Sequence, residues 1–492
     1  MQGKRNSQMP LFVSGNLSDF VPREHLLRKV DTVLDLGFVR RLTKKFYCQN
    51  NGRPSLDPIV YFKLQVIAYL YGIKSDRQLC EEIQYNMAYR WYLGYPLDEQ
   101  PPNHSTLTRT RDRLGEETFR KVFEKILKNC QKVGLVRGQQ IISDASLIKA
   151  DASKNSLVPR NPDEKFDSKK KKSNKNHVSK SDPESTMVGR NGYGNKLYYK
   201  VHSSIDAKSR VITDCYITTG ATHECNILND RIDFQKRKLK LPIKEVIADS
   251  GYGHGPTYKK FAEQRVKTYI PLRDKKLGKG KNSAPDNFKF DRANNRYICV
   301  GDQGLYPHKP SVGFVRYRVT NGACKDCALK GKCFENQTTK DRPRYVNRSF
   351  FQDTFDHIRK RMDSKVFKEK MVERAWKIEG IFGEAKTNHG LSRAKYRGRS
   401  KTQIQLYMIS SVQNLKRLLG HFSQQFSEIL SSLMQLEVIK IKISIASSFL
   451  TSKFIKNQNK NQNWLHSIIR RVYQQAERFF EQSPPCSYTM SF

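Results

Sequence analysis

The chain has 492 residues, enough for about three domains. It carries 90 Lys and Arg against 47 Asp and Glu, a formal net charge of +43. This balance argues against a metabolic enzyme and favours a polyanionic partner, most simply nucleic acid. Ten cysteines are too few for a disulfide scaffold, and the N-terminal residues hold no apolar run long enough for a signal peptide. We therefore expect a cytoplasmic protein with reduced thiols and no membrane partner.

Residues 1–136 are predicted to form an all-α N-terminal domain. Asp57-Pro58, for example, is a typical helix start, with an acid at the N-cap and proline at the first helical position. Short helices separated by turns suggest a helix-turn-helix-like DNA reader, in which Arg109, Arg111 and Arg113 would contact DNA. An ordinary helical bundle with a basic solvent face is the alternative.

From about residue 139 the pattern changes to a mixed α/β layout. Strands are predicted over 139–147, 197–205, 211–219, 245–249 and 268–272, and helices over 224–239, 256–265, 364–387 and 400–419. Residues 137–420 are thus expected to form a second domain, followed by a basic tail over 421–492. The lysine run 169–172 is read as a solvated loop, with contact to DNA phosphates as the alternative.

Two aspartates stand at the ends of apolar strands in the second domain. Asp144 follows Ile141-Ile142-Ser143, and Asp249 follows Val246-Ile247-Ala248. A charge there costs free energy unless it is paired, hydrogen-bonded or metal-bound. Two in one sheet favour a metal site, because hard divalent cations prefer oxygen ligands. Two such ions roughly 4 Å apart can activate a water or hydroxyl and stabilise a leaving phosphodiester oxygen. That chemistry usually needs a third acid.

The predicted helix 364–387 offers a candidate for this third acid. Glu379 recurs at spacings of three or four with Val372, Trp376, Phe382, Gly383 and Lys386. We therefore expect Glu379 to face the apolar side of the helix, where an acid is seldom only structural. Gly383 would allow DNA to approach closely, and Lys386 could bind a phosphate.

Taken together, these residues resemble bacterial insertion-sequence transposases of the DDE type with an InsH-like N-terminal domain. The resemblance covers residues 20–420. In the N-terminal part it rests on residues 21–31, 52–58, 75–78 and 104–106. In the second part it rests on Ser143-Asp144-Ala145, Tyr199-Lys200-Val201-His202, Ala248-Asp249-Ser250-Gly251-Tyr252, Glu379-Gly380-Ile381-Phe382-Gly383 and Asn414-Leu415-Lys416-Arg417. The combination is specific, whereas any one motif alone would be weak.

The resemblance implies an RNase H-like mixed sheet as the catalytic core of residues 137–420. It implies that Asp144, Asp249 and Glu379 are the catalytic triad and bind two magnesium or manganese ions. The reaction would be cleavage at the ends of the element and joining of the 3′-hydroxyl to target DNA, mostly by positioning and charge neutralisation. The implied partners are double-stranded DNA of the element's terminal repeats and of the target, bound by a homodimer.

The helix that carries Glu379 matches the family pattern only in part. Lys386 fits the Glu-x6-Lys spacing, which implies binding to a DNA phosphate. Upstream, Val372 and Ala375 stand where the pattern has Tyr and Arg, and Arg374 is one residue away. Arg374 is still a candidate for DNA binding. His202 and His223 could lie beside the site, although a structural role is the simpler interpretation for both.

Residues 275–350 are predicted to be an insertion within the catalytic domain. It holds Cys299, Cys324, Cys327 and Cys333, with a Cys-x2-Cys pair at its centre. A structural zinc site would fit these ligand types and would staple a segment too polar to fold around its own core. The five-residue gap before Cys333 departs from a second Cys-x2-Cys pair, so free or redox-active thiols are the alternative.

Three functions remain open from the sequence. The first is an active DDE transposase. The second is a divalent-metal nuclease on the same core that cuts but does not join strands. The third is a basic DNA-binding protein, a decayed copy that no longer transposes. All three acids stand in intact motifs, which favours the first. The tail over 421–492 could be an added DNA-binding arm or read-through past an older stop.

Overall fold

The structure, a computed structural model, describes residues 15–48, 54–161, 172–190, 194–273, 288–325, 327–329, 333 and 345–425. The chain divides into two compact units, Met1–His421 and Phe422–Phe492. All that follows concerns the first unit. Most of the predicted basic tail and residues 169–171 of the lysine run lie outside the described residues. Within the described ranges, no helix is both long and apolar enough to span a membrane.

The described elements up to residue 132 are all helical. They are α1 (Leu17–Phe20), α2 (Leu26–Val33), α3 (Phe38–Thr43), the 3-10 helix Lys44–Phe46, α4 (Pro58–Leu70), α5 (Asp76–Tyr85), α6 (Met87–Leu93) and α7 (His104–Lys132). The helix start predicted at Asp57 is confirmed, because its Oδ1 accepts a 2.8 Å hydrogen bond from the amide of Ile59. Gly115 has a φ of +65°, which interrupts α7 and which glycine adopts without strain.

The N-terminal helices share a contact seam with residues 388–396. His389 Nδ1 lies 2.6 Å from the carbonyl oxygen of Tyr69, and Lys395 pairs with Asp76 at 2.7 Å. A Cβ atom built on Gly72, whose φ is +66°, would lie 2.5 Å from the carbonyl oxygen of Asn388. Backbone therefore meets backbone at this seam, and a larger residue does not fit at Gly72.

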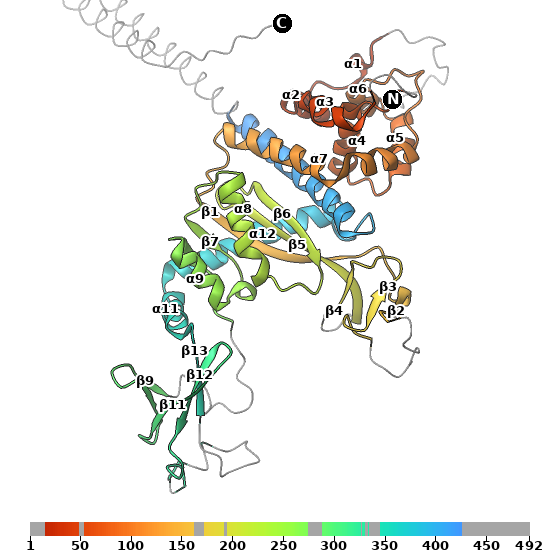
Figure 1. The fold of residues 1–492 in the computed structure, drawn as a ribbon. Coiled ribbons are helices and arrows are strands. Elements are labelled where there is room, and N and C mark those ends of the chain that lie inside the picture. The colour runs from red at the N-terminus through yellow and green to blue at the C-terminus, as the bar shows by residue number, and fades with distance from the viewer. Residues whose placement is uncertain are drawn as a thin grey trace, which may run out of the picture. The chain divides into compact units, whose positions relative to one another are not determined.

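A six-stranded mixed sheet forms the centre of the second part (Figure 1). Its strands are β1 (Gln140–Lys149), β4 (Thr186–Arg190), β5 (Gly194–Asp206), β6 (Ile212–Thr219), β7 (Glu245–Ile247) and β8 (Lys267–Tyr269). The order is β4-β5-β1-β7-β8, and β6 also pairs with the long β5. β1 is antiparallel to β5 and parallel to β7. A separate short pair joins β2 (Leu157–Pro159) to β3 (His177–Ser179).

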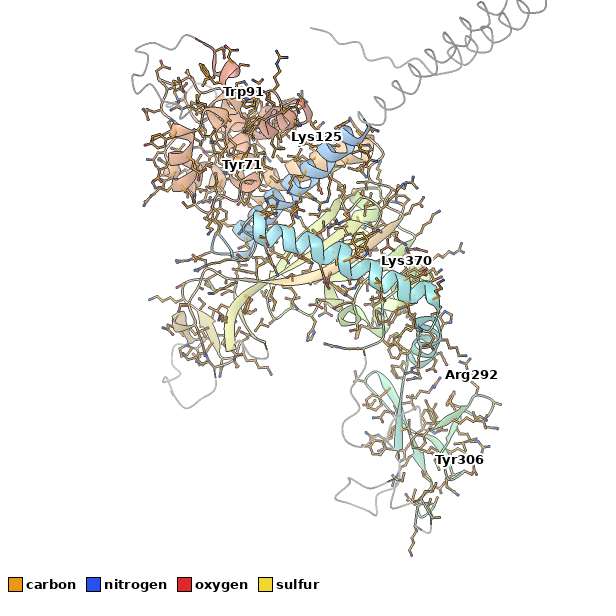
Figure 2. All side chains as sticks on the ribbon, turned by 180° about the vertical axis from the view of Figure 1, so that it is seen from behind. Tyr71, Trp91, Lys125, Arg292, Tyr306 and Lys370 are labelled. Carbon is orange, nitrogen blue, oxygen red and sulfur yellow. The ribbon has the colours of Figure 1, made fainter. Side chains whose placement is uncertain are left out.

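Helices cover both faces of this sheet. They are α8 (Cys225–Lys238), α9 (Gly255–Glu263), α11 (Gln352–Met362) and α12 (Lys365–Asn388). α8 lies in front of the sheet in Figure 1, and α12 crosses it in Figure 2, which is seen from behind. Arg231 of α8 donates to Asp214, which aligns through β5 with Ser143. Arg374 of α12 instead reaches Asp144. Because neighbouring strand residues point to opposite faces, α8 and α12 lie on opposite sides of β1.

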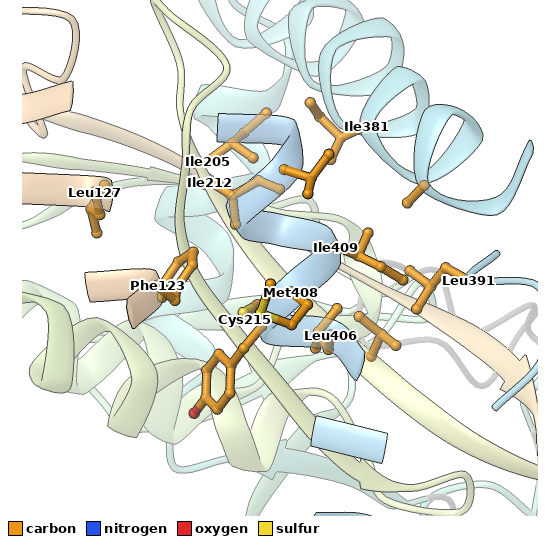
Figure 3. Close-up of a cluster of buried hydrophobic side chains, with 14 of the residues drawn as sticks. Phe123, Leu127, Ile205, Ile212, Cys215, Ile381, Leu391, Leu406, Met408 and Ile409 are labelled. Atoms are coloured by element: carbon orange, nitrogen blue, oxygen red, sulfur yellow. The ribbon is translucent and has the colours of Figure 1, made fainter. Parts of the chain in front are cut away.

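A helix beginning at residue 399 completes the core of the first unit. Figure 3 shows Leu406, Met408 and Ile409 of this helix among side chains of β5, β6, α7 and α12. Its polar residues are used as well. Asn414 Oδ1 accepts from the amide of Ile212 and its Nδ2 donates to the carbonyl of the same residue, at 2.8 and 2.9 Å. These bonds hold the helix against the start of β6.

The insertion predicted over 275–350 has a hydrophobic core of its own. Its strands are β9 (Lys289–Asp291), β10 (Arg296–Ile298), β11 (Gly304–Ser311), β12 (Phe314–Val319) and β13 (Tyr345–Ser349), which form one antiparallel sheet. Six buried side chains pack on it: Phe288, Tyr297, Leu305, Tyr317, Val319 and Val346. The expectation that this segment is too polar to fold around its own core is therefore wrong. Aromatic residues spaced across several strands supply the apolar area that the polar composition conceals.

Candidate active site

Asp144 lies in the middle of β1 and Asp249 lies just beyond the end of β7, the parallel neighbour of β1, so the expectation that Asp144 stands at a strand end is wrong. The register pairs Ile142 of β1 with Ile247 of β7. Asp144 and Asp249 each come two residues later, so the alternation of side chains directs both to the same face. The negative charge of Asp249 is among the causes that raise the pKa of Asp144, which places the two carboxylates near each other. The sheet thus brings together the two aspartates that the sequence singled out.

Burial disfavours the charged form of both carboxylates. Burial raises the pKa of Asp144 to about 6, while Arg374 and the amide of Ala145 lower it. Burial also raises the pKa of Asp249, with Glu224 as the next cause. The amide of Gly251 donates to Asp249 Oδ1 at 2.9 Å and fixes that side chain. Two partly desolvated carboxylates of like charge repel each other, and a divalent cation would relieve that repulsion, so the pair fits a metal.

Arg374 reaches this pair from α12. Its Nη1 donates to Asp144 Oδ2 at 2.8 Å, and its side chain is 14% exposed. In this structure the guanidinium therefore neutralises a site carboxylate. The sequence pattern that placed an arginine one residue later on the helix does not describe this contact, because Ala375 points about 100° away from Arg374 on the helix.

Glu379 lies on an exposed side of α12, and the expectation that it faces the apolar side is wrong. Two other members of the predicted stripe, Val372 and Trp376, are 67% and 56% exposed and line an open surface hollow of about 590 Å³. The buried face is instead formed by Phe367, Ile378, Ile381, Phe382 and Ala385. The stripe chosen from the sequence mixed residues of two faces, because spacings of three and four drift round a helix over several turns.

The side of the helix that carries Glu379 can be read from its neighbours. Lys377 donates to the backbone carbonyl of Ala207, beyond the end of β5. Glu379 is two residues further, about 200° round the helix, and so points away from β5. The neighbour of β1 on that other side is β7, which leads to Asp249. Glu379 therefore emerges on the flank of α12 that is turned toward the end of β7.

Lys386 lies on the same flank as Glu379, because seven residues make nearly two full turns. Its Nζ is 2.6 Å from Ser146 Oγ, on the same face of β1 as Asp144. Lys386 and Arg374 thus approach one strand from two points along α12. This places a second cation on the face of β1 that carries Asp144.

The arginines of α7 separate into exposed and buried residues. Arg109 and Arg113 are exposed. Arg111 is 4% exposed; it pairs with Asp76 at 3.0 Å and stacks 3.9 Å from the ring centre of Tyr396. The expectation that Arg111 contacts DNA is therefore wrong. A spacing of two places Arg111 about 200° from each of the other two arginines, on the face that packs against the protein.

Of the two histidines considered as neighbours of the site, His202 does not share the face of Asp144. His202 aligns with Ala145 of β1, so its side chain points to the side opposite Asp144. It is buried, its Nε2 lies 2.9 Å from Thr218 Oγ1, and burial lowers its pKa to about 3. The structural interpretation of His202 is thus supported. His223 is exposed at the turn before α8.

The four cysteines of the insertion come together only in part. A Cβ atom on Gly301 would lie 3.3 Å from Cys327 Sγ and 3.8 Å from Cys299 Sγ, so these two sulfurs border one space. Cys324 packs against the small core of the insertion. Across the described part of the chain, no three His, Cys, Asp or Glu side chains are spaced to hold a metal ion. The predicted zinc site thus stays a prediction, with two of its sulfurs placed near each other.

Sequence reasoning missed one acid of the site, Glu224. It precedes α8 and is the second cause, after burial, of the raised pKa of Asp249. The signal for it was an acid at the first position of the helix predicted over 224–239, next to His223, which by itself predicts only a favourable helix start.

Comparisons with known proteins give two family matches. A transposase domain of the DUF772 family matches residues 15–113, and a transposase DDE domain matches residues 306–419. The second match includes Glu379 and Lys386, whereas Asp144 and Asp249 precede it in the chain. The two matches lie in the two parts that the sequence analysis had separated.

Solved structures with detectable similarity are also transposases. The piggyBac transposase synaptic complex with hairpin DNA has a TM-score of 0.34 at 11% identity, covering 91% of this chain and 85% of that one. The Mos1 paired-end complex with the left transposon end has a TM-score of 0.15 at 10% identity, covering 45% of this chain and 61% of that one. The two family matches agree with the resemblance drawn from the motifs: residues 15–113 match a transposase domain and residues 306–419 match a transposase DDE domain.

Proposed function

We propose that the protein cleaves DNA at the ends of its element and joins the freed 3′-hydroxyl to target DNA, on an RNase H-like core. The observation that carries this proposal is the register-matched pair of Asp144, in the middle of β1, and Asp249, just beyond the end of β7. Two adjacent carboxylates facing a helix that carries Glu379, Arg374 and Lys386 form a site with both metal-binding and phosphate-binding groups.

In this proposal each side chain has a distinct task. Asp144 and Asp249, with Glu379, would hold two magnesium or manganese ions, which supply charge neutralisation at the phosphodiester. Lys386 would bind a phosphate of the DNA, and Arg374 would keep Asp144 ionised until the site is filled. The exposed Arg109 and Arg113 of α7 would bind the phosphate backbone of double-stranded DNA. A homodimer would hold two element ends, and the protein would act on the bacterial nucleoid.

The proposal is tested with purified full-length protein and the DNA that flanks its own gene, in magnesium or manganese. Wild type is compared with Asp249→Ala and with Asp230→Ala, whose side chain on α8 is 81% exposed and serves as the matched control. We expect cutting and joining by wild type and the control, and neither by Asp249→Ala. Cutting without joining would replace the proposal by a nuclease. DNA binding without any cutting by wild type would replace it by a DNA-binding protein without catalytic activity.

A further inference from the structure

One face of the five-stranded sheet of the insertion is exposed and carries cations and tyrosines. The opposite face carries the six buried side chains of the small core. Residues that lie directly opposite each other in an antiparallel pair point to the same face, so the register identifies the exposed one. Arg316 of β12 lies opposite Lys309 of β11. Arg318 lies between Tyr306 of β11, which Figure 2 labels, and Tyr345 of β13.

Two further cations extend this face across β9 and β10. Arg296 Nη1 lies 3.4 Å from the Tyr306 hydroxyl. Lys289 lies opposite Ile298, two residues after Arg296, so the alternation of side chains places it on the same face. Among the described strand residues of the insertion, the one acid on this face is Asp291, which pairs with Arg296 at 3.0 Å. The face, called the basic face below, comprises Lys289, Arg296, Lys309, Arg316 and Arg318.

Most of the charge on the basic face is not neutralised by the protein. Within the described residues, Lys309, Arg316 and Arg318 form no ion pair, whereas Arg296 does. Lys309 and Arg316 even stand directly opposite each other on neighbouring strands. Like charges in that position destabilise a sheet. The protein thus keeps this charge at a cost in stability, which a bound polyanion would offset.

The guanidinium of Arg316 is fixed in place while its terminal nitrogens stay available. Its Cζ lies 4.7 Å from the centre of the Tyr345 ring, and its Nε donates to Asn347 Oδ1 at 3.3 Å. In the described part of the chain, no hydrogen bond from its Nη1 or Nη2 is recorded. A planar guanidinium held in this way can bind a phosphate through two parallel N–H groups, with little loss of side-chain freedom.

The two tyrosines favour a double-stranded ligand over a single strand. Single strands are usually bound by aromatic rings on which unpaired bases stack. Here Arg316 covers one face of the Tyr345 ring, and the Tyr306 hydroxyl contacts Arg296. Both tyrosines therefore support arginines, and arginines are the side chains that contact the phosphate backbone of a duplex.

We propose that the basic face of the insertion binds the phosphate backbone of double-stranded DNA, as a surface separate from α7. The inference deepens the proposed function and rests on it, because it assumes that duplex DNA is the substrate. Arg316 and Arg318 lie about 7 Å apart along β12, since each strand residue rises about 3.3 Å, so they would reach two phosphates. Phosphate contacts carry no sequence information, so the basic face should bind duplexes of any sequence.

The test measures binding of the full-length protein to a short fluorescent duplex of unrelated sequence, by anisotropy at several salt concentrations. Wild type is compared with the double variant Arg316→Gln/Arg318→Gln. The matched control is Arg292→Gln/Lys259→Gln, which removes two charges from exposed side chains that already pair with acids. We expect the first variant to bind about tenfold more weakly and to reduce the slope of log K against log salt by about 2, and the control to bind within twofold of wild type.

Two further variants separate phosphate binding from a structural role of the arginines. Arg316→Lys/Arg318→Lys keeps both charges, so it should keep the slope and lose only a few-fold in affinity, because lysine lacks the paired N–H groups. Tyr345→Leu removes the ring beneath Arg316 but no charge, and it should also weaken binding a few-fold at an unchanged slope. Circular dichroism verifies that each variant is folded.

The outcomes distinguish the inference from the function on which it rests. If the double glutamine variant and the control bind the duplex equally, the inference is overturned, while cleavage and joining by wild type would still support the proposed function. If the double glutamine variant loses affinity for a single strand but not for the duplex, the inference is also wrong. If the lysine variant loses as much affinity and slope as the glutamine variant, the arginines are structural and the inference fails. If wild type binds no duplex, the proposed function fails and the inference fails with it.

Discussion

The sequence predicts the positions of functional side chains much better in the strands of this protein than in its helices. Asp144 and Asp249 lie together because β1 and β7 pair in one register, and strand residues can point in only two directions. On α12 and α7 a residue can point anywhere around the axis. There Glu379 is exposed where burial was expected, and Arg111 is buried where exposure was expected. Strand-borne acids can therefore be located from local sequence, while helix-borne groups need the packing partner.

The largest effect should come from Glu379, which tests whether its flank of α12 belongs to the site. Glu379→Gln should lower the rate of DNA strand cleavage by about a thousandfold, as expected when a group that stabilises transition-state charge is removed, and leave DNA affinity unchanged. Glu373→Gln is the matched control on the opposite flank, where Glu373 pairs with Lys370 and Lys377. Equal loss in both variants would contradict the assignment of flanks.

Arg111 gives the next largest effect, on stability. Arg111→Met should lower the free energy of unfolding by about 3 kcal/mol, because it leaves Asp76 with one cation fewer in a buried place. Arg113→Met, at an exposed position two residues later, should change it by less than about 0.5 kcal/mol. Urea unfolding followed by circular dichroism measures both. Similar stabilities for the two variants would remove the contrast between the faces of α7.

Asp144 is expected to be needed for activity and to lower the stability of the metal-free protein at high pH. Its folded pKa of about 6 lies above the ordinary value of 3.8, so the folded state resists ionisation. Wild type therefore loses stability as pH rises from about 4 to above 6, by at most roughly 3 kcal/mol. Asp144→Asn avoids this loss and should stabilise the metal-free protein by about 2 kcal/mol at pH 8, but not at pH 4. Thermal unfolding in a chelator at both pH values measures it; a variant less stable than wild type at pH 8 would mean that the Arg374 pair dominates.

The smallest effects belong to the exposed arginines of α7. Arg109→Gln and Arg113→Gln should each weaken binding to duplex DNA several-fold, whatever its sequence, and reduce the slope of log K against log salt by about 1. Arg120→Gln is a suitable control, because Arg120 is engaged by Glu117 and Glu124 on the same helix. Fluorescence anisotropy at several salt concentrations gives the slopes. An unchanged slope in both variants would remove α7 from the DNA-binding surface.

Much of the fold could be predicted from local sequence signals. The strand predicted over 139–147 appears as β1, and the helix predicted over 364–387 appears as α12, because strong periodicity and caps such as Ser364 define them. Of the site, the aspartate pair could be predicted and Glu224 could not. Glu224 comes next to Asp249 only through the crossover that brings α8 back over the sheet, a contact that no local spacing encodes. The core of the insertion was hidden for the same reason, since its aromatic residues meet only across strands.

The seam between the N-terminal helices and residues 388–396 has a consequence for how such proteins can be recombined. Gly72 meets the backbone carbonyl of Asn388, and the buried His389 side chain contacts the backbone carbonyl of Tyr69, so the fit at this seam depends on both segments. A chimera that takes only the helices up to residue 132 from a related transposase would therefore carry a mismatched joint. Exchange of the N-terminal helices should succeed when the short segment after α12 is exchanged with them. These two segments, distant in the sequence, therefore have to be inherited together.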